Sequence, residues 1–200
     1  MKKILLVVLV IAIMFTLVAC GNNDEIEENN NALTVDSGEE LEIIKDFEAV
    51  EIPDDEKVTY IILEGLEEPV NYVGVKSALG YVLQYDPDIF AISKDGSKDL
   101  YASIDNEDVY FTIEILAEGE EVKGEREEAI IDGYEVYREM FLNGEKVDTI
   151  IADKFDDVIT NNFYVKTPEK TFKLTTNYTM DCLEGFGYRI LNMLGTFKVQ

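Results

Sequence analysis

The run Val109-Tyr110-Phe111-Thr112-Ile113-Glu114-Ile115 decides the fold of this chain, because apolar side chains recur in it at every second position. Successive side chains of an extended chain point to opposite faces. One face therefore carries Val109, Phe111, Ile113 and Ile115, and the other carries Tyr110, Thr112 and Glu114. This pattern predicts a β-strand with one face in a hydrophobic core.

Similar alternation on both sides of this run predicts further strands. They are expected at 47–52, 58–63, 70–75, 79–85, 134–142, 147–152, 163–166, 171–178 and 196–199. Asn143-Gly144 is a strong hairpin signal, because a two-residue hairpin turn needs positive φ at both positions. It would join 134–142 to 147–152, and 167–170 would join the next pair. The sequence therefore indicates an antiparallel sheet of about six to eight strands.

Two helices are expected beside the sheet. Residues 119–131 are rich in Glu and Lys, which favour helix, and predict a short surface helix with Gly124 as its weak point. Near the end, Asp181 is a candidate N-cap with Glu184 three residues later, and Leu183, Phe186, Ile190, Leu191 and Leu194 follow at helical spacing. Gly185 and Gly187 suggest that this helix approaches the sheet closely. The prediction is an α+β fold with the C-terminal helix packed on one face of the sheet.

The N-terminus has the form of a bacterial lipoprotein signal. Met1-Lys2-Lys3 is followed by an apolar run at 4–19, and Leu17-Val18-Ala19-Cys20-Gly21 matches a lipobox. We expect residues 1–19 to be removed and the Cys20 thiol to carry diacylglycerol, since two acyl chains give stable membrane attachment. An uncleaved transmembrane helix is the alternative, but the apolar run is shorter than the roughly 20 residues that a span requires. A secreted form without lipid is a further alternative.

The lipobox and the composition of the chain predict three segments. They are the signal peptide at 1–19, a lipidated and flexible acidic tether at 20–45, and one globular domain at 46–200. The localisation expected is the outer, extracytoplasmic face of the cell membrane. If Cys20 is lipidated, Cys182 has no partner for a disulfide within the chain.

The charge of the chain argues against nucleic acid as a partner. Seventeen basic residues stand against 42 acidic ones, for a net charge of −25. Nucleic-acid binding requires a clustered basic surface, and the arginines are limited to Arg126, Arg138 and Arg189. The acidity also opposes adsorption to an anionic lipid surface.

No catalytic, cofactor-binding or metal-binding residue can be assigned from the sequence. The chain contains no histidine, which removes Ser-His and Cys-His nucleophiles. Its serines lie in no hydrolase motif, and no phosphate-binding glycine loop opens a helix. The acidic runs 105–108 and 153–157 could offer oxygen ligands to Ca²⁺, but neither has the spacing of an EF-hand loop, so solvated acidic loops are favoured.

Cys182 and the tyrosines have a structural and a functional interpretation. Cys182 follows Asp181, which does not activate a thiol, so a partly buried structural cysteine is favoured over a redox centre. Aromatic side chains could line a carbohydrate or peptide groove, although packing within a sheet is favoured. The tyrosines concerned are Tyr81, Tyr85, Tyr101, Tyr110, Tyr134, Tyr137, Tyr164 and Tyr178.

Three stretches together carry a family resemblance. They are 64–70, Leu79-Gly80-Tyr81-Val82-Leu83-Gln84-Tyr85-Asp86-Pro87-Asp88-Ile89-Phe90, and 184–197. They resemble exported proteins and lipoproteins of Gram-positive bacteria that carry an LGYxxxYDPxxF hairpin near the start of the domain and an EGxGxRxxxMLxTF helix at its end. More distantly, residues 58–199 are similar to the PsbP-like fold, a sheet flanked by helices. The resemblance implies no known reaction.

These observations favour a membrane-anchored lipoprotein whose extracytoplasmic domain is not an enzyme and binds a protein, a peptide or another envelope component. An accessory or assembly factor of an envelope complex is the first alternative. A hydrolase that works through paired carboxylates is the second, and it is disfavoured because the motifs of such enzymes are missing.

Overall fold

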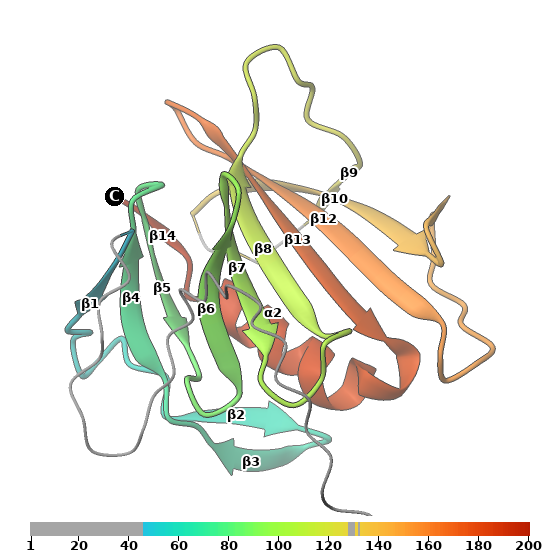
Figure 1. Ribbon diagram of the computed structural model, residues 1–200, viewed down its shortest axis with the longest axis horizontal. Helices are drawn as coiled ribbons and strands as arrows, with labels where there is room; N and C mark the ends of the chain where they lie inside the picture. Colours follow the sequence, from blue (N-terminus) through green and yellow to red (C-terminus); the bar gives the residue numbers. More distant parts are fainter. Residues whose placement is uncertain (1–45, 128–130, 132) are drawn as a thin grey trace, which may run out of the picture. The chain divides into compact units, whose positions relative to one another are not determined.

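The computed structural model describes residues 46–127, 131 and 133–200. The predicted signal peptide and tether lie outside the described residues. Within them the chain is mostly antiparallel β-structure followed by one helical segment, so the predicted α+β class is confirmed (Figure 1). One sheet was expected, but the strands form three.

The largest sheet has eight strands. Its strands are β6 (Phe90–Asp95), β7 (Lys98–Ser103), β8 (Tyr110–Ile115), β9 (Glu125–Glu127), β10 (Glu135–Leu142), β11 (Glu145–Val147), β12 (Val158–Lys166) and β13 (Thr171–Thr179). Along the sheet the order is β11-β10-β12-β13-β8-β7-β6, and β9 pairs with β10 beside β11. The stretch that decides the fold is β8, near the middle of the sheet.

Two smaller sheets complete the β-structure. The four-stranded sheet has the order β1 (Phe47–Val50), β4 (Val73–Ser77), β5 (Tyr81–Tyr85) and β14 (Lys198–Val199). The two-stranded sheet is the hairpin of β2 (Tyr60–Leu63) and β3 (Leu66–Pro69).

The C-terminal helical segment begins with a 3₁₀ turn and ends in an α-helix. Its parts are the 3₁₀ turn Met180–Cys182, the π-helical turn Leu183–Gly187 and α2 (Tyr188–Leu194). Asp181 lies inside the first turn and is not the N-cap, so that prediction is wrong. Gly187 does approach the sheet as expected, since a Cβ there would lie 3.3 Å from the Tyr178 ring, whereas Gly185 has open space.

The core lies between the inner face of the eight-stranded sheet and two layers that cover it. From the helical segment, Phe186 meets Phe90 edge to face at 6.3 Å between ring centroids. From the four-stranded sheet, Tyr81 meets Phe172 at 6.1 Å and Phe47 meets Tyr101 at 6.4 Å. Tyr101 also stacks on Phe111 at 4.4 Å. The helical segment and the small sheet therefore pack on the same face of the large one.

The surface helix predicted at 119–131 is wrong wherever these residues are described. Residues 125–127 form strand β9, which pairs with 136–138 of β10. Gly119 and Gly124 have φ of 89° and 88°, which a right-handed helix does not allow. The helix propensity of the Glu and Lys residues is overridden by strand pairing on the edge of the sheet.

Several strand predictions also need correction. Residues 148–152 are not a strand, because the return strand β11 ends at Val147. Residues 70–72 lie between β3 and β4, and strands β3, β6 and β7 and residues 158–162 of β12 were not predicted. The Asn143-Gly144 turn was predicted correctly, with φ of 50° and 81°.

Candidate functional site

The predicted lipidation residue, Cys20, lies outside the described residues. Over 46–127, 131 and 133–200, the structure contains no helix with the length and apolarity that a membrane crossing demands.

The two acidic runs considered as calcium ligands have internal hydrogen-bond partners. The Asp157 carboxylate accepts the backbone N–H groups of Asp153 and Lys154, each at 3.0 Å, and the Asn143 side-chain amide at 2.9 Å. These bonds, led by the one from Asn143, lower the pKa of Asp157. In the other run, Asn106 accepts the backbone N–H of Asp108 at 3.0 Å. No group of three or more acidic or cysteine side chains is arranged to hold a metal in the part of the chain that the structure describes.

Cys182 and the tyrosines mostly serve packing. The Cys182 thiol is half-buried and receives the Asn106 side-chain amide at 3.5 Å. Five of these tyrosines are buried, namely Tyr81, Tyr85, Tyr101, Tyr164 and Tyr178. The other three, Tyr110, Tyr134 and Tyr137, are half-buried. Burial raises the pKa of Tyr85 to about 12. Only some of the predicted aromatic positions are therefore accessible to a ligand.

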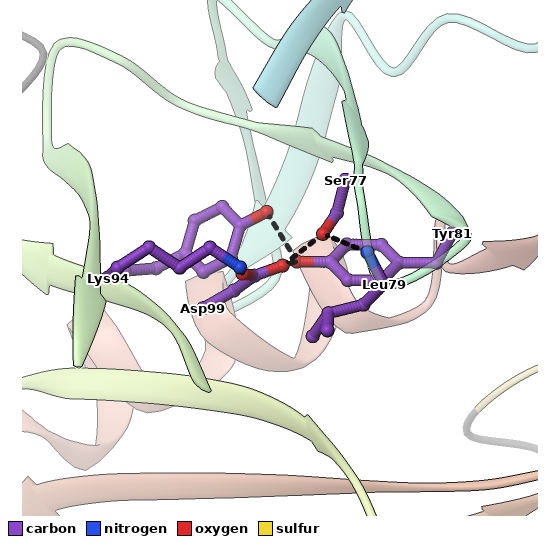
Figure 2. Close-up of polar contacts among 6 residues, drawn as sticks. Ser77, Leu79, Tyr81, Lys94 and Asp99 are labelled. Carbon is purple, nitrogen blue, oxygen red and sulfur yellow. Dashed lines mark hydrogen bonds and ion pairs between the residues drawn. The ribbon is translucent and has the colours of Figure 1, made fainter. Parts of the chain in front are cut away.

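A buried polar cluster joins the four-stranded sheet to the eight-stranded sheet. Figure 2 shows Ser77, Tyr81 and Lys94 converging on the Asp99 carboxylate. The Tyr81 hydroxyl donates to Asp99 Oδ2 at 2.5 Å and lies 3.1 Å from the Tyr101 hydroxyl. The Lys94 ammonium faces Oδ1, which has no aligned hydrogen bond and therefore relies on this ion pair.

The geometry of this cluster makes it a structural brace. Asp99 is fully buried and Ser77 nearly so, which leaves no space for a substrate beside the serine. Burial, followed by the neighbouring Tyr101 and Asp99, raises the pKa of Tyr81 well above its ordinary value. Sequence reasoning missed the cluster, although one signal was present: Asp99 shares the inward face of β7 with Tyr101.

The three stretches that carry the family resemblance meet around Arg189. The Arg189 guanidinium pairs with Glu68, which lies on β3 in the first stretch. Asp86, from the second stretch, is buried, and that burial raises its pKa while Arg189 opposes the rise. Tyr72 is also buried there; burial and then the Asp86 charge raise its pKa. Arg189 therefore helps to hold the β2-β3 hairpin on the C-terminal helix.

A hollow of about 280 Å³ opens at the sheet edge between β9 and β11. Two of the three cations that line it are paired within the protein: Arg138 with Glu127 at 3.7 Å and Lys146 with Glu139 at 2.7 Å. Burial raises the pKa of Glu139, but the hydrogen bonds from Lys146 and Tyr164 outweigh this and lower it. The charges of the hollow are largely compensated within the protein.

The outer face of the eight-stranded sheet is the better candidate for binding. The strand registers place side chains of successive strands in rows that cross the sheet. Two adjacent rows form a surface that we name the neutral strip. The first row is Phe141, Thr160, Asn177, Tyr110, Ala102 and Ala91. The second is Asn162, Thr175, Thr112, Leu100 and Ser93, and it ends at β12 because its next member, on β10, is the charged Glu139.

No residue of the neutral strip carries a charge, although 30% of the whole chain is charged. Its residues are half-buried, apart from the buried Thr112, while their neighbours Phe111, Ile113 and Phe163 on the other face are fully buried. The helical segment packs on that other face, as the contact of Phe186 with Phe90 shows. Strands β6, β7, β8, β13 and β12 lie side by side beneath the strip (Figure 1).

Hydrogen bonds fix some polar groups of the neutral strip. Thr160 donates to the Asn177 side chain at 3.0 Å, and Thr175 donates to Asn162 Oδ1 at 2.8 Å. Among the described residues, no protein atom accepts a hydrogen bond from Asn162 Nδ2 or pairs with the hydroxyls of Tyr110 and Thr112. These groups are available to a ligand.

Ion pairs border the neutral strip. Glu114 on β8 lies 3.4 Å from Lys173 on β13 and 3.6 Å from Lys98 on β7, so in the next row of the sheet one carboxylate lies between two ammonium groups. At the β10 end, Glu139 is paired with Lys146. Each strand contributes at most two residues to the strip. The strip therefore cannot be recognised within any one strand and becomes visible only from the pairing register of the strands.

Comparisons with known proteins add little to this geometry. No family model matches the chain, and no curated protein matches it either. Among solved structures, it is similar to a crystal structure from Bacteroides thetaiotaomicron VPI-5482, with 12% sequence identity and a TM-score of 0.40. The match covers 60% of this chain and 45% of that one, so the chain spans less than half the length of that protein.

Proposed function

We propose that this protein is a lipid-anchored binding protein of the bacterial envelope, whose domain holds an envelope component against the neutral strip without catalysing a reaction. The neutral strip is the observation that carries the proposal. A protein of net charge −25 would ordinarily spread acidic side chains over an open sheet face, and here the acidic residues Glu114 and Glu139 lie at the borders of the strip and none lies within it. Depletion of charged residues together with aromatic side chains is typical of the centre of a binding surface.

The anchoring half of the proposal rests on the sequence. The lipobox at 17–20 and the apolar run at 4–19 support a diacylglyceryl anchor on Cys20. A tether over 20–45 would give a reach of roughly 25 to 30 Å, and more if its acidic residues repel one another. The resemblance of residues 58–199 to exported Gram-positive lipoproteins supports the same location.

The rigidity of the sheet supports a role in binding. Each row of the neutral strip lies on strands whose opposite face is packed into the aromatic core, so the polar groups are held in place before a ligand arrives. A surface that is already ordered loses less conformational entropy on binding than a flexible loop does.

The binding half of the proposal can be tested with Ala102→Glu. This substitution places a charged side chain in the first row of the strip, between Tyr110 and Ala91. The protein is incubated with washed envelopes from cells that lack its gene, and the bound fraction is measured by sedimentation. We expect saturable binding that Ala102→Glu weakens at least tenfold.

Ser97→Glu is the matched control, because Ser97 is exposed in the β6-β7 turn outside the strip and receives the same charge. It should bind as the unsubstituted protein does. Equal binding by both variants would show that the strip is not the binding surface.

A further inference from the structure

We infer that the ligand of the neutral strip is an uncharged glycan chain, an inference that rests on the proposed function. The polar groups of the strip are hydroxyls and amides, which both donate and accept hydrogen bonds. Asn162 Nδ2 and the Tyr110 and Thr112 hydroxyls are without partners among the described residues. Sugar hydroxyls are suited to all three, because each can donate to one group and accept from another.

Aromatic side chains give the strip apolar faces as well. Tyr110 and Phe141 lie in its first row, and both are half-buried with a ring partly open to solvent. The C–H face of a sugar ring is apolar and can lie on an aromatic ring, while its hydroxyls reach the neighbouring polar row. Two aromatic rings among hydroxyl and amide groups match the two kinds of surface that a sugar presents.

The charges around the strip argue for a neutral ligand. A phosphate or carboxylate polymer would need a cluster of free cations, but the bordering Lys98 and Lys173 share the Glu114 carboxylate, which leaves at most one uncompensated positive charge there. The net charge of −25 would also repel such a polymer. A cationic ligand would in turn find no carboxylate on the strip itself. Charge complementarity therefore selects an uncharged chain.

The size of the strip argues against a protein partner. Strands lie about 4.8 Å apart, so the rows from β6 to β10 run about 24 Å across the sheet. Two rows with their side chains are about 14 Å wide, which gives an area of about 350 Å². A stable protein interface needs about 800 Å² on each partner. The long and narrow shape fits a single extended polymer chain, such as a few sugar units, better than a folded surface.

Two substitutions test the inference with soluble neutral oligosaccharides, namely tetramers of N-acetylglucosamine and of glucose, titrated into the full mature protein by calorimetry. Asn162→Asp keeps the oxygen that accepts from Thr175 but replaces the free donor with a negative charge. Tyr110→Ala removes an aromatic ring of the first row. We expect at least one tetramer to bind, and each substitution to weaken its binding by about tenfold, the effect of losing one hydrogen bond or aromatic contact. Raising NaCl to 0.5 M should leave the affinity unchanged, since no ion pair forms.

Matched controls separate loss of binding from loss of folding. Ser97→Asp adds the same charge outside the strip, and Tyr60→Ala removes a tyrosine that is 55% exposed on β2. Both should bind the tetramer normally, and all four variants should melt cooperatively. Equal binding by the strip variants and the controls would overturn the inference, as would failure of both tetramers to bind.

A photo-crosslinking experiment distinguishes this inference from the proposed function. A photoreactive phenylalanine derivative replaces Ala102 in the full chain, and intact cells are irradiated. If mass spectrometry finds that the peptide containing position 102 carries added masses that repeat in units of a sugar, the result supports a glycan as the ligand. A protein adduct instead overturns the glycan inference and leaves the proposed function standing. If no adduct forms and Ala102→Glu also leaves envelope binding unchanged, both the glycan inference and the proposed function are overturned.

Discussion

Asp99 illustrates how one buried side chain can connect two sheets. Its carboxylate lies in the aromatic core, where an unpaired charge would be costly, and both of its oxygens face partners. Ser77 and Tyr81 come from the four-stranded sheet, while Lys94 comes from the large sheet. The contact therefore ties the two sheets together by polar bonds in addition to apolar packing.

Removing this carboxylate should destabilise the fold strongly. Asp99→Ala leaves the Lys94 ammonium and two hydroxyls without their shared partner, and breaking a buried ion pair costs about 3 to 5 kcal/mol. Because the Lys94 side chain is 23% exposed, we expect about 3 kcal/mol, measured as the loss in free energy of unfolding in urea. Asp95→Ala, at the exposed end of β6, should change stability by less than about 0.5 kcal/mol. Similar values for the two variants would show that the cluster does not stabilise the fold.

The residue scale also shows where reasoning from sequence stops. Inward-facing Val109, Phe111 and Ile113 were correctly placed in the core, because their apolar character and spacing agree, whereas Ile115, predicted on the same face, is 41% exposed at the end of β8. Asp99 could not be placed there, since a lone acid in a strand pattern normally indicates the solvent face. Its burial depends on Ser77 and Tyr81, which lie 22 and 18 positions away in sequence.

At the scale of elements, Gly124 explains why a segment with helix propensity becomes a strand. Its backbone passes so close to β10 that a Cβ would lie 2.0 Å from the Arg138 carbonyl oxygen. Its φ of 88° also excludes the helix. Glycine permits both the close approach and the left-handed backbone, and β9 can then pair with β10.

Gly124→Ala should therefore release β9 from the sheet. The substitution adds a steric clash to the strain of positive φ, and that strain alone costs about 1 to 2 kcal/mol. We expect faster hydrogen–deuterium exchange at 125–127 and little change in β12 or β13. Gly119→Ala is the control for strain without a clash, because Gly119 has φ of 89° and no atom within 4 Å of its Cβ position. Equal exchange in the two variants would indicate that the contact with Arg138 does not hold β9.

Elements with strong periodicity were predicted well and short ones were not. Strands β8, β10 and β13 follow clear alternation, and the Asn143-Gly144 turn has only one suitable conformation. Only 163–166 of β12 were predicted, because the buried Asn161 interrupts the apolar face of its first half. Strands β6 and β7 were missed because Lys94 and Asp99 interrupt the apolar face that they would otherwise show. The Lys94 ammonium and the Asp99 carboxylate form their ion pair only when β6 and β7 are paired with each other.

At the scale of the whole molecule, the neutral strip could not have been predicted at all. Its residues run from 91 to 177 in the chain and come from separate strands, each of which looks like an ordinary half-polar strand. The strip exists only because the registers align uncharged positions, two from each of five strands and Phe141 from β10. The sequence shows the composition of each strand, but the register depends on how all of them pack.

The acidity of the whole molecule should make its stability depend on salt. Charges of the same sign repel one another in the compact state, and salt shortens the range of that repulsion from about 10 Å at 0.1 M to about 3 Å at 1 M. We expect the Tm, followed by circular dichroism, to rise between 0.05 and 0.5 M NaCl. CaCl₂ at matched ionic strength should give a similar rise. A much larger rise with calcium would contradict screening and indicate a specific calcium site.

The location of the molecule depends on which cysteine is modified, and the chain offers its own control because it has only two. Cys20→Ala removes the thiol that would carry the lipid, whereas Cys182→Ala changes a half-buried thiol of the folded domain. We expect the unsubstituted protein and Cys182→Ala to partition into the detergent phase and to carry a diacylglyceryl mass on the N-terminal peptide. Cys20→Ala should be unprocessed or released from the membrane without that mass. If Cys20→Ala remained in the membrane with unchanged size, the apolar run at 4–19 would itself be the anchor and the lipid would not be needed.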